Sequence, residues 1–138
     1  MFVVGSSLPR IPKGTGPVNH MVADAYIKIL ESRGSFDVKL FFIELTKGDL
    51  AVIKEMFSLH YVIPRLDVQH VTYSDPALMT SLIRLAKAAP IQTIMFIRTI
   101  LLDEHMVELA ALVKAATNLV HLVAVDCRQL LEPVRHGG

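Results

Sequence analysis

The stretch that decides the fold is residues 91–101, Ile-Gln-Thr-Ile-Met-Phe-Ile-Arg-Thr-Ile-Leu, because its spacing of apolar residues recurs along the chain. Apolar or small residues stand at its positions one, four, six, nine and eleven. Shifting the numbering by 28 finds most of the same pattern at residues 35–45, 63–73 and 119–129. Four blocks in register predict a chain of repeated units, since periods of about 20–50 residues are typical of repeat architectures.

The second half of each unit predicts a helix. Asp75-Pro76 and Asp103 stand 28 residues apart, each just before apolar residues at helical spacing. Asp accepts a hydrogen bond from a first-turn N–H, and Pro suits the first helical position. Asn19 is an equivalent cap, whereas the intermediate unit has Lys47 there, so we expect Asp49 to cap that helix. The expected helices are residues 20–33, 50–60, 76–89 and 104–117, and the apolar stripe of the last comprises Met106, Leu109, Leu112, Val113 and Ala116.

These signals divide one domain, covering residues 1–138, into strand–helix units. The first unit is irregular, because Arg10 and Pro12 occupy its inward strand positions, and we place its strand at residues 2–4 instead. Prolines and glycines mark the following residues as a loop. The predicted division is an N-terminal unit 1–34 with a loop at 6–17, repeats 35–62, 63–90 and 91–118, and a partial C-terminal unit 119–138.

The spacing L-x-x-L-x-L-x-x-(N/C/T)-x-L, Thr99 and Cys127 at its ninth position and the run Leu101-Leu102-Asp103-Glu104 resemble ribonuclease-inhibitor-type leucine-rich repeats over residues 35–138. The resemblance implies a short α/β solenoid, with parallel strands on the concave side and helices on the convex side. It implies a scaffold for binding rather than a particular activity. Ile43 and Val71 stand where the family usually has Asn, so we expect these two turns to be less regular.

A three-layer, doubly wound α/β domain is the alternative fold. Parallel strands buried on both faces also give continuous apolar runs such as residues 94–97 and 122–125. The equal length of the units favours the solenoid, because a doubly wound fold does not require it.

Composition narrows the function classes. A net charge of +1 argues against a protein that mainly neutralises phosphates, which leaves nucleic acid as a local contact within an assembly. The single cysteine, Cys127, excludes an internal disulfide and favours a reducing, intracellular compartment such as the cytoplasm or the interior of a mitochondrion. No apolar run approaches the ~18 residues of a membrane span.

The outward strand side chains are the candidate partner-binding residues. Alternation puts positions three, five and seven of each strand on the side away from the core. Met95, Ile97, Val123 and Val125 are expected to form one apolar patch, and such patches mark interaction surfaces. The candidate site comprises Phe41, Arg65, Met95, Ile97, Arg98, His121, Val123 and Val125.

Two features favour the alternative of a small α/β enzyme or nucleotide-binding protein. The loop Gly14-Thr15-Gly16-Pro17 precedes a helix, whose N-terminus suits an anion. It lacks a complete phosphate-binding motif, and Pro17 removes a donor, so an insertion between strand and helix is the simpler interpretation. Cys127 lies near a strand end, but its place in the repeat predicts a buried, structural thiol.

No metal or cofactor is expected. The six histidines do not pair with one another or with Cys127 at metal-ligand spacing, and His105, with Glu104 and Glu108, is expected on a solvated helix face.

The repeat, the patch and an end without a full helix favour a binding or assembly module, a subunit of a larger intracellular complex with protein partners. A structural role in a ribonucleoprotein is a third hypothesis, which the near-zero net charge does not support.

Overall fold

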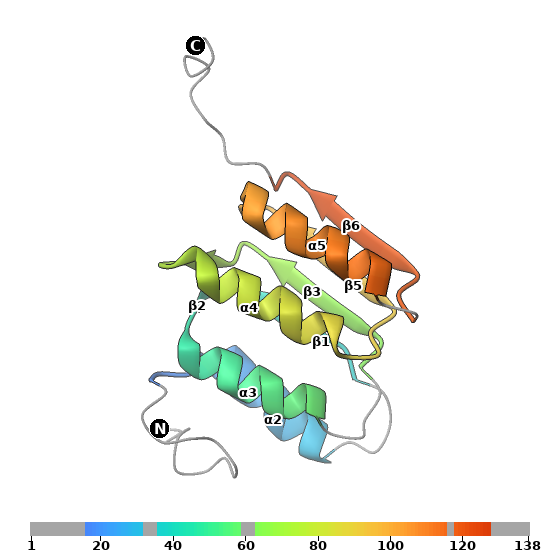
Figure 1. Cartoon of the computed structure of the whole chain (residues 1–138). Helices are drawn as coiled ribbons and strands as arrows, with labels where there is room; N and C mark the ends of the chain where they lie inside the picture. Colours follow the sequence, from blue (N-terminus) through green and yellow to red (C-terminus); the bar gives the residue numbers. More distant parts are fainter. Residues whose placement is uncertain (1–15, 32–35, 59–62, 116–117, 128–138) are drawn as a thin grey trace.

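The computed structural model describes residues 16–31, 36–58, 63–115 and 118–127 (Figure 1). They form a mixed α/β structure with a parallel sheet. The predicted strand at residues 2–4 and most of the predicted loop 6–17 lie outside the described residues. The elements, in chain order, are α2 (His20–Glu31), β1 (Val38–Phe41), β2 (Glu44–Leu45), α3 (Lys47–Ser58), β3 (Arg65–Gln69), β4 (Thr72–Tyr73), α4 (Pro76–Lys87), β5 (Thr93–Ile97), α5 (Asp103–Ala115) and β6 (His121–Val125).

The strands pair in the register that the sequence period predicts. The larger sheet has the order β1-β3-β5-β6, all parallel, and a two-stranded parallel sheet joins β2 to β4. Val38 lies opposite Leu66, and Ile94 opposite both Leu66 and Leu122, so each partner is 28 residues along the chain. The spacing found in the sequence is therefore the spacing between hydrogen-bonded strands.

The helices follow the same order as the strands. α2 packs on α3, α3 on α4 and α4 on α5. Figure 1 shows α3, α4 and α5 side by side on the same side of the sheet. The strand residues that face this layer belong to one continuous core, which explains why positions four and six are apolar in each unit. The buried apolar residues of the larger sheet are Val38, Leu40, Leu66, Val68, Ile94 and Phe96.

α2 lies beside the first strand of the sheet. The backbone N–H of Phe41 points away from β3 and approaches Met21 Sδ at 2.9 Å. Residues of α2 and β1 also line a shared hollow of about 420 Å³. Edge strands expose unpaired backbone groups, and α2 shields part of this edge.

The start of α3 corrects the predicted helix 50–60. The helix begins at Lys47, and Asp49 lies inside its first turn. Thr46 Oγ1 accepts from the Asp49 N–H at 2.9 Å, while Asp49 Oδ2 accepts from the Thr46 N–H at 3.0 Å. This is a reciprocal capping box, so Thr46 is the cap and Asp49 its partner.

Asp49 also ties α3 to α2. Its carboxylate is fully buried, and it accepts from the Asn19 backbone N–H at 2.7 Å and from Asn19 Nδ2 at 2.6 Å. Asn19 precedes α2 as predicted, but its side chain serves the neighbouring unit, donating also to the Glu44 carbonyl at 2.8 Å. Together with Thr46, three N–H donors compensate the desolvation of this carboxylate.

The other two helix starts differ from each other. Asp75 caps α4 as predicted, since Oδ1 accepts from the Ala77 N–H at 2.9 Å and Pro76 is the first helical residue. Asp103, predicted as a cap, is instead the first residue of α5.

The turns after the four strands share one backbone conformation. Phe42, His70, Arg98 and Asp126 have φ of 55°, 51°, 47° and 52°. Few non-glycine residues adopt positive φ, yet here one does so every 28 residues. The N–H groups of the first three donate to the last strand residue of the next unit at 2.9–3.0 Å. The prediction that the turns at Ile43 and Val71 are less regular is therefore wrong.

Where the ninth-position side chain is polar, it adds hydrogen bonds to those of the backbone between neighbouring units. Thr99 Oγ1 accepts from the Val71 N–H at 3.2 Å and donates to the Ile97 carbonyl at 3.1 Å. Cys127 Sγ donates to the Phe96 carbonyl at 3.2 Å. The turns have the same backbone whether or not the side chain is polar, so backbone hydrogen bonds between units determine their shape.

Thr99→Val should lower the free energy of unfolding by about 1–3 kcal/mol, because it leaves the buried Val71 N–H without its acceptor. Urea denaturation monitored by circular dichroism measures the change. Thr93→Val, at a half-buried position of β5 facing away from the helices, is the matched control. Equal losses in the two variants would contradict the role given to Thr99.

Candidate functional site

One face of the sheet points away from α3, α4 and α5, and most of its side chains stay exposed or half-buried. We call it the outward face. The strand register arranges its residues in rows, one residue from each strand. The outward face consists of Lys39, Phe41, Arg65, Asp67, Gln69, Thr93, Met95, Ile97, His121, Val123 and Val125.

The four apolar candidates lie together on this face. Met95 is opposite Val123, and Ile97 is opposite Val125, on strands about 4.8 Å apart. Val125 is exposed, and the other three are half-buried. The predicted apolar patch is therefore contiguous and open to solvent, at the β5–β6 side of the sheet.

Arg65 forms a charged border to the patch. Its Nε donates to Asp67 Oδ1 at 2.8 Å, and its Nη2 approaches Met95 Sδ at 2.7 Å. The Arg65 side chain thereby covers Asp67, which is buried although it belongs to the outward face. Because Arg65 remains partly exposed, the ion pair contributes little to stability, and its main effect is to fix the guanidinium beside the patch.

The remaining candidates, His121, Phe41 and Arg98, lie at different distances from the apolar patch. His121 lies opposite Thr93 at the start of β6 and is exposed. Phe41 is on the other edge of the sheet, separated from Ile97 by Gln69 in its row. Arg98 is not in a strand at all. The structure therefore brings Arg65, Met95, Ile97, His121, Val123 and Val125 together and leaves Phe41 and Arg98 apart.

Arg98 belongs to a column of turn residues that sequence reasoning missed. Phe42, 73% exposed, stacks on His70 with ring centroids 4.5 Å apart and planes 12° apart. Arg98 Nε lies 3.9 Å from Asp126 Oδ2. The period alone could have aligned these four positions, but their residue types share nothing that marks a turn.

A hollow of about 460 Å³ adjoins this column, lined in part by His70, Tyr73 and Arg98. Tyr73 donates its hydroxyl to the Ile100 carbonyl at 2.7 Å. Burial and the nearby Glu104 charge raise the pKa of Tyr73 above its usual value, so it stays a protonated donor at neutral pH. The phenol thus connects two units.

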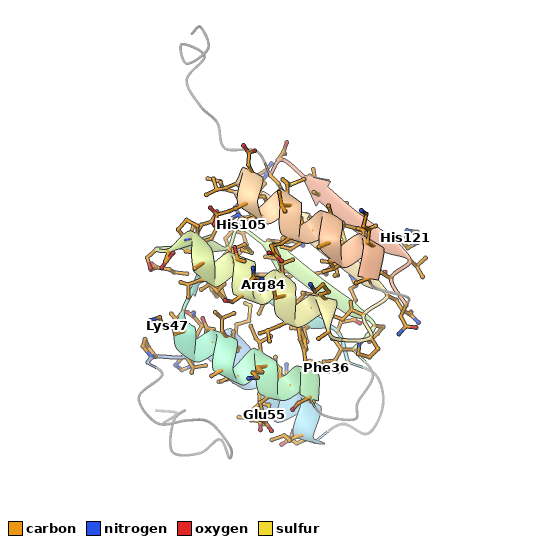
Figure 2. All side chains as sticks on the ribbon, in the orientation of Figure 1. Phe36, Lys47, Glu55, Arg84, His105 and His121 are labelled. Atoms are coloured by element: carbon orange, nitrogen blue, oxygen red, sulfur yellow. The ribbon has the colours of Figure 1, made fainter. Side chains whose placement is uncertain are left out.

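His105 is the main error of sequence reasoning in this region. Expected on a solvated helix face, it is 0% exposed and lies between α4 and α5 (Figure 2). Its Nδ1 accepts from the Leu102 N–H at 2.9 Å, which leaves Nε2 as the donor to the Pro76 carbonyl, also at 2.9 Å. The Tyr73 ring packs against it at 5.4 Å in a T-shaped arrangement.

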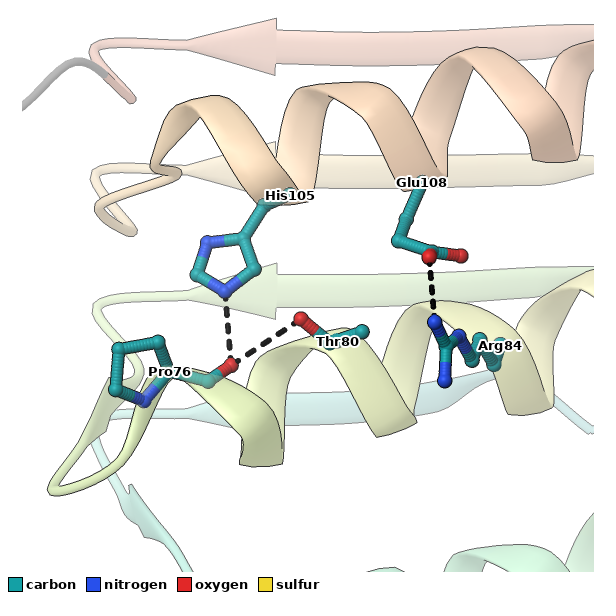
Figure 3. A network of polar contacts seen from close by, with 5 residues as sticks. All are labelled: Pro76, Thr80, Arg84, His105 and Glu108. Atoms are coloured by element: carbon teal, nitrogen blue, oxygen red, sulfur yellow. Dashed lines mark hydrogen bonds and ion pairs between the residues drawn. The ribbon is translucent and has the colours of Figure 1, made fainter.

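Figure 3 shows how α4 and α5 are connected. His105 and Thr80 both reach the Pro76 carbonyl, and Arg84 Nη2 donates to Glu108 Oε2 at 2.8 Å. The hydrogen bond from Arg84 holds the pKa of Glu108 below its usual value. The stabilisation by this pair is therefore present above the pKa of an unfolded Glu and is lost as the pH falls. Its exposure keeps the contribution small.

Two features of the sequence favour an enzyme or a nucleotide-binding protein, namely Cys127 and the loop that ends at Pro17. Cys127 is buried, and its Sγ lies 3.2 Å from both the Phe96 and the Val125 carbonyl oxygens, which share its single proton, as in a structural cysteine. Gly14 and Thr15 lie outside the described residues. The Pro17 carbonyl accepts from Thr46 Oγ1 at 2.6 Å, and a Cβ on Gly48 would lie 2.3 Å from the same oxygen, so this end of the loop is packed against the start of α3.

The described part of the chain has neither a metal-binding cluster nor a membrane-spanning helix. No three His, Cys, Asp or Glu residues there are grouped so as to hold a metal ion. None of the described helices has the length and apolar character to cross a bilayer.

The fold and site thus define an α/β protein with a parallel sheet, one face of which the described residues leave uncovered, and an apolar patch on that face. Comparison with family models, curated proteins and solved structures finds no match to this chain.

His105→Ala should lower the free energy of unfolding by about 2–3 kcal/mol, since it removes a buried ring, leaves the Leu102 N–H without its acceptor and takes one donor from the Pro76 carbonyl. His121→Ala, which removes an exposed histidine, should change it by less than about 0.5 kcal/mol. Chemical denaturation of both variants provides the comparison. A similar small effect for both would show that His105 does not join α5 to α4.

Proposed function

We propose that this chain is a short leucine-rich-repeat solenoid that acts as a protein–protein interaction or assembly module, a subunit of a larger intracellular complex. The outward face of the sheet is its binding surface. The observation that carries the proposal is the contiguous apolar patch of Met95, Ile97, Val123 and Val125, left uncovered by the described chain.

Three features support a solenoid over the three-layer alternative. Every strand pairs with the strand one period away, each helix packs on the helix of the next unit, and α3, α4 and α5 lie on one side of the sheet. Strands are about 4.8 Å apart but packed helices are 8–10 Å apart. A stack with one helix for each strand therefore curves, with its strands on the inner side.

The composition of the outward face suits a protein partner. Interface centres are apolar and enriched in Met and Arg, with polar residues around them. Met95 and Ile97 would be the centre of the contact, while Arg65 and His121 would lie at its border. Because the strands and the Arg65–Asp67–Met95 contacts are already formed, binding would cost little conformational entropy.

Ile97→Glu and Met95→Glu, made separately, should each reduce partner capture at least about tenfold, the effect of losing roughly 1.4 kcal/mol of binding free energy. A glutamate at either position would be desolvated on binding without a partner charge. The measurement is affinity capture from native lysate, with the retained proteins identified and quantified by mass spectrometry.

Lys54→Glu is the control, because it changes an exposed charge on α3, on the other side of the sheet. All three variants should keep the circular dichroism spectrum and melting temperature of a folded chain. If both outward-face variants retain the same proteins at the same level as the unaltered chain, the outward face is not the binding surface.

A further inference from the structure

The last unit of the described chain leaves apolar positions more open than the unit before it does. Met106 on α5 is 49% exposed, whereas Leu78, its equivalent one period earlier on α4, is 8% exposed. Leu122 is half-buried and Ala124 exposed, where the equivalent Ile94 and Phe96 are 1% exposed. Of the apolar stripe predicted for α5, Leu109 and Leu112 are buried, whereas Met106 and Val113 are about half exposed because no further described helix covers them.

These residues share one side of the molecule. Glu108, paired with Arg84, marks the flank of α5 that faces α4. At about 100° per residue, Met106, Ala110 and Val113 fall on the opposite flank. They continue across β6 through Leu122 and Ala124, the strand residues that point toward the helix layer. We call these five residues, Met106, Ala110, Val113, Leu122 and Ala124, the end face.

The backbone of β6 is open on the same side. The His121 N–H and the Val125 carbonyl bond toward β5. Because successive residues of a strand bond in opposite directions, the N–H and C=O groups of Leu122 and Ala124 point away from β5, in the plane of the sheet. Among the described residues, no strand pairs with this edge.

The charges beside the end face are separated into two groups. Asp103, at the start of α5, and Asp126, after β6, lie at one end, since helix and strand run in opposite directions. The Asp126 carboxylate already lies 3.9 Å from Arg98 Nε, so of these two acidic groups Asp103 is the one that no described residue pairs with. Lys114, near the end of α5, and His121, at the start of β6, lie at the other. Figure 2 agrees, with His105 near the start of α5 and His121 toward its other end. All four flanking side chains are exposed.

We infer that the end face binds a second copy of this chain. A two-fold axis near Val123 would run β6 antiparallel to its counterpart and α5 antiparallel to its counterpart. Asp103 of each copy would then meet Lys114 of the other, as the self-complementary surface of a two-fold dimer requires. Leu122 of one copy would pair with Ala124 of the other, which joins the two sheets edge to edge.

The size of the end face predicts a weak dimer. α5 has 13 residues and is about 20 Å long, and the sheet lies about 10 Å behind it. The contact is therefore at or below the low end of the roughly 1,200–2,000 Å² of specific interfaces. Ala110 and Ala124, where α4 and β5 have Leu82 and Phe96, leave the face flat enough for close approach. We expect dissociation constants in the micromolar range.

Charge exchange tests the two-fold arrangement. Analytical ultracentrifugation of the unaltered chain from about 1 to 300 µM should show a monomer–dimer equilibrium. Lys114→Glu makes both ends acidic, and Asp103→Lys makes α5 basic at both ends, so each variant alone should dimerise at least about tenfold more weakly. Mixed in equal amounts, the two variants should recover association, because opposite charges meet again at both ends.

Ala124→Pro tests the joining of the sheets. It removes an N–H that points away from β5 and leaves the hydrogen bonds to β5 in place, and proline is tolerated in an edge strand. The variant should therefore no longer dimerise, while its circular dichroism spectrum stays that of the unaltered chain. Lys54→Glu on α3, remote from the end face, is the charge-matched control and should dimerise normally.

The contact does not depend on the function proposed above, because it uses a different surface. A chain that stays monomeric at 300 µM would overturn the inference. The end face would then be a contact surface for another segment of the chain or for a different protein. Failure of the mixed variants to recover association would overturn the antiparallel arrangement, and a dimer that survives Ala124→Pro would overturn the joined sheet.

Discussion

The whole structure depends on the pairing of each strand with the strand that follows it one period later. A residue and its partner 28 positions on share a row of the sheet, and the same shift relates the short strands β2 and β4. This register determines which side chains meet. It places apolar positions four and six of β1, β3 and β5 in one core, and it brings Met95 beside Val123. A non-glycine residue at positive φ follows each strand of the larger sheet, and the first three of these residues donate their N–H to the next unit.

Contacts at the helix starts reinforce the register. Asp49 and His105 occupy equivalent places two periods apart, and each joins the first turn of its helix to the unit before. One is a carboxylate that accepts backbone and amide N–H groups, and the other is an imidazole that accepts on one nitrogen and donates from the other. Two different side chains thus join the first turn of a helix to the preceding unit, and for this reason the repeat of residue types in the sequence does not reveal the contact.

Strand positions, their register, the Asp75 cap and the burial of Cys127 could be predicted from the sequence, because each depends on spacing or local hydrogen bonding. The predictions that failed concern residues whose environment is set by contacts between neighbouring units. His105 was expected in solvent because it adjoins Glu104 and Glu108, and only the packing of α5 on α4 buries it. The outward patch followed from strand alternation, whereas the Arg65–Asp67–Met95 contacts and the column of turn residues need the folded rows to be seen. Thr46 and Asp49 form a capping box whose spacing was present in the sequence but was interpreted as a single cap.

Contacts between elements of the described chain run chiefly from each unit to the next. In such an arrangement each unit is stabilised mainly by the units next to it, so the free energy of local unfolding of a unit depends on how many neighbours it has. β3 and β5 each have a strand on both sides, whereas β6 has one. Amide protons of the central strands should therefore exchange with solvent most slowly, and the molecule should loosen by fraying inward from β6 before it unfolds as a whole.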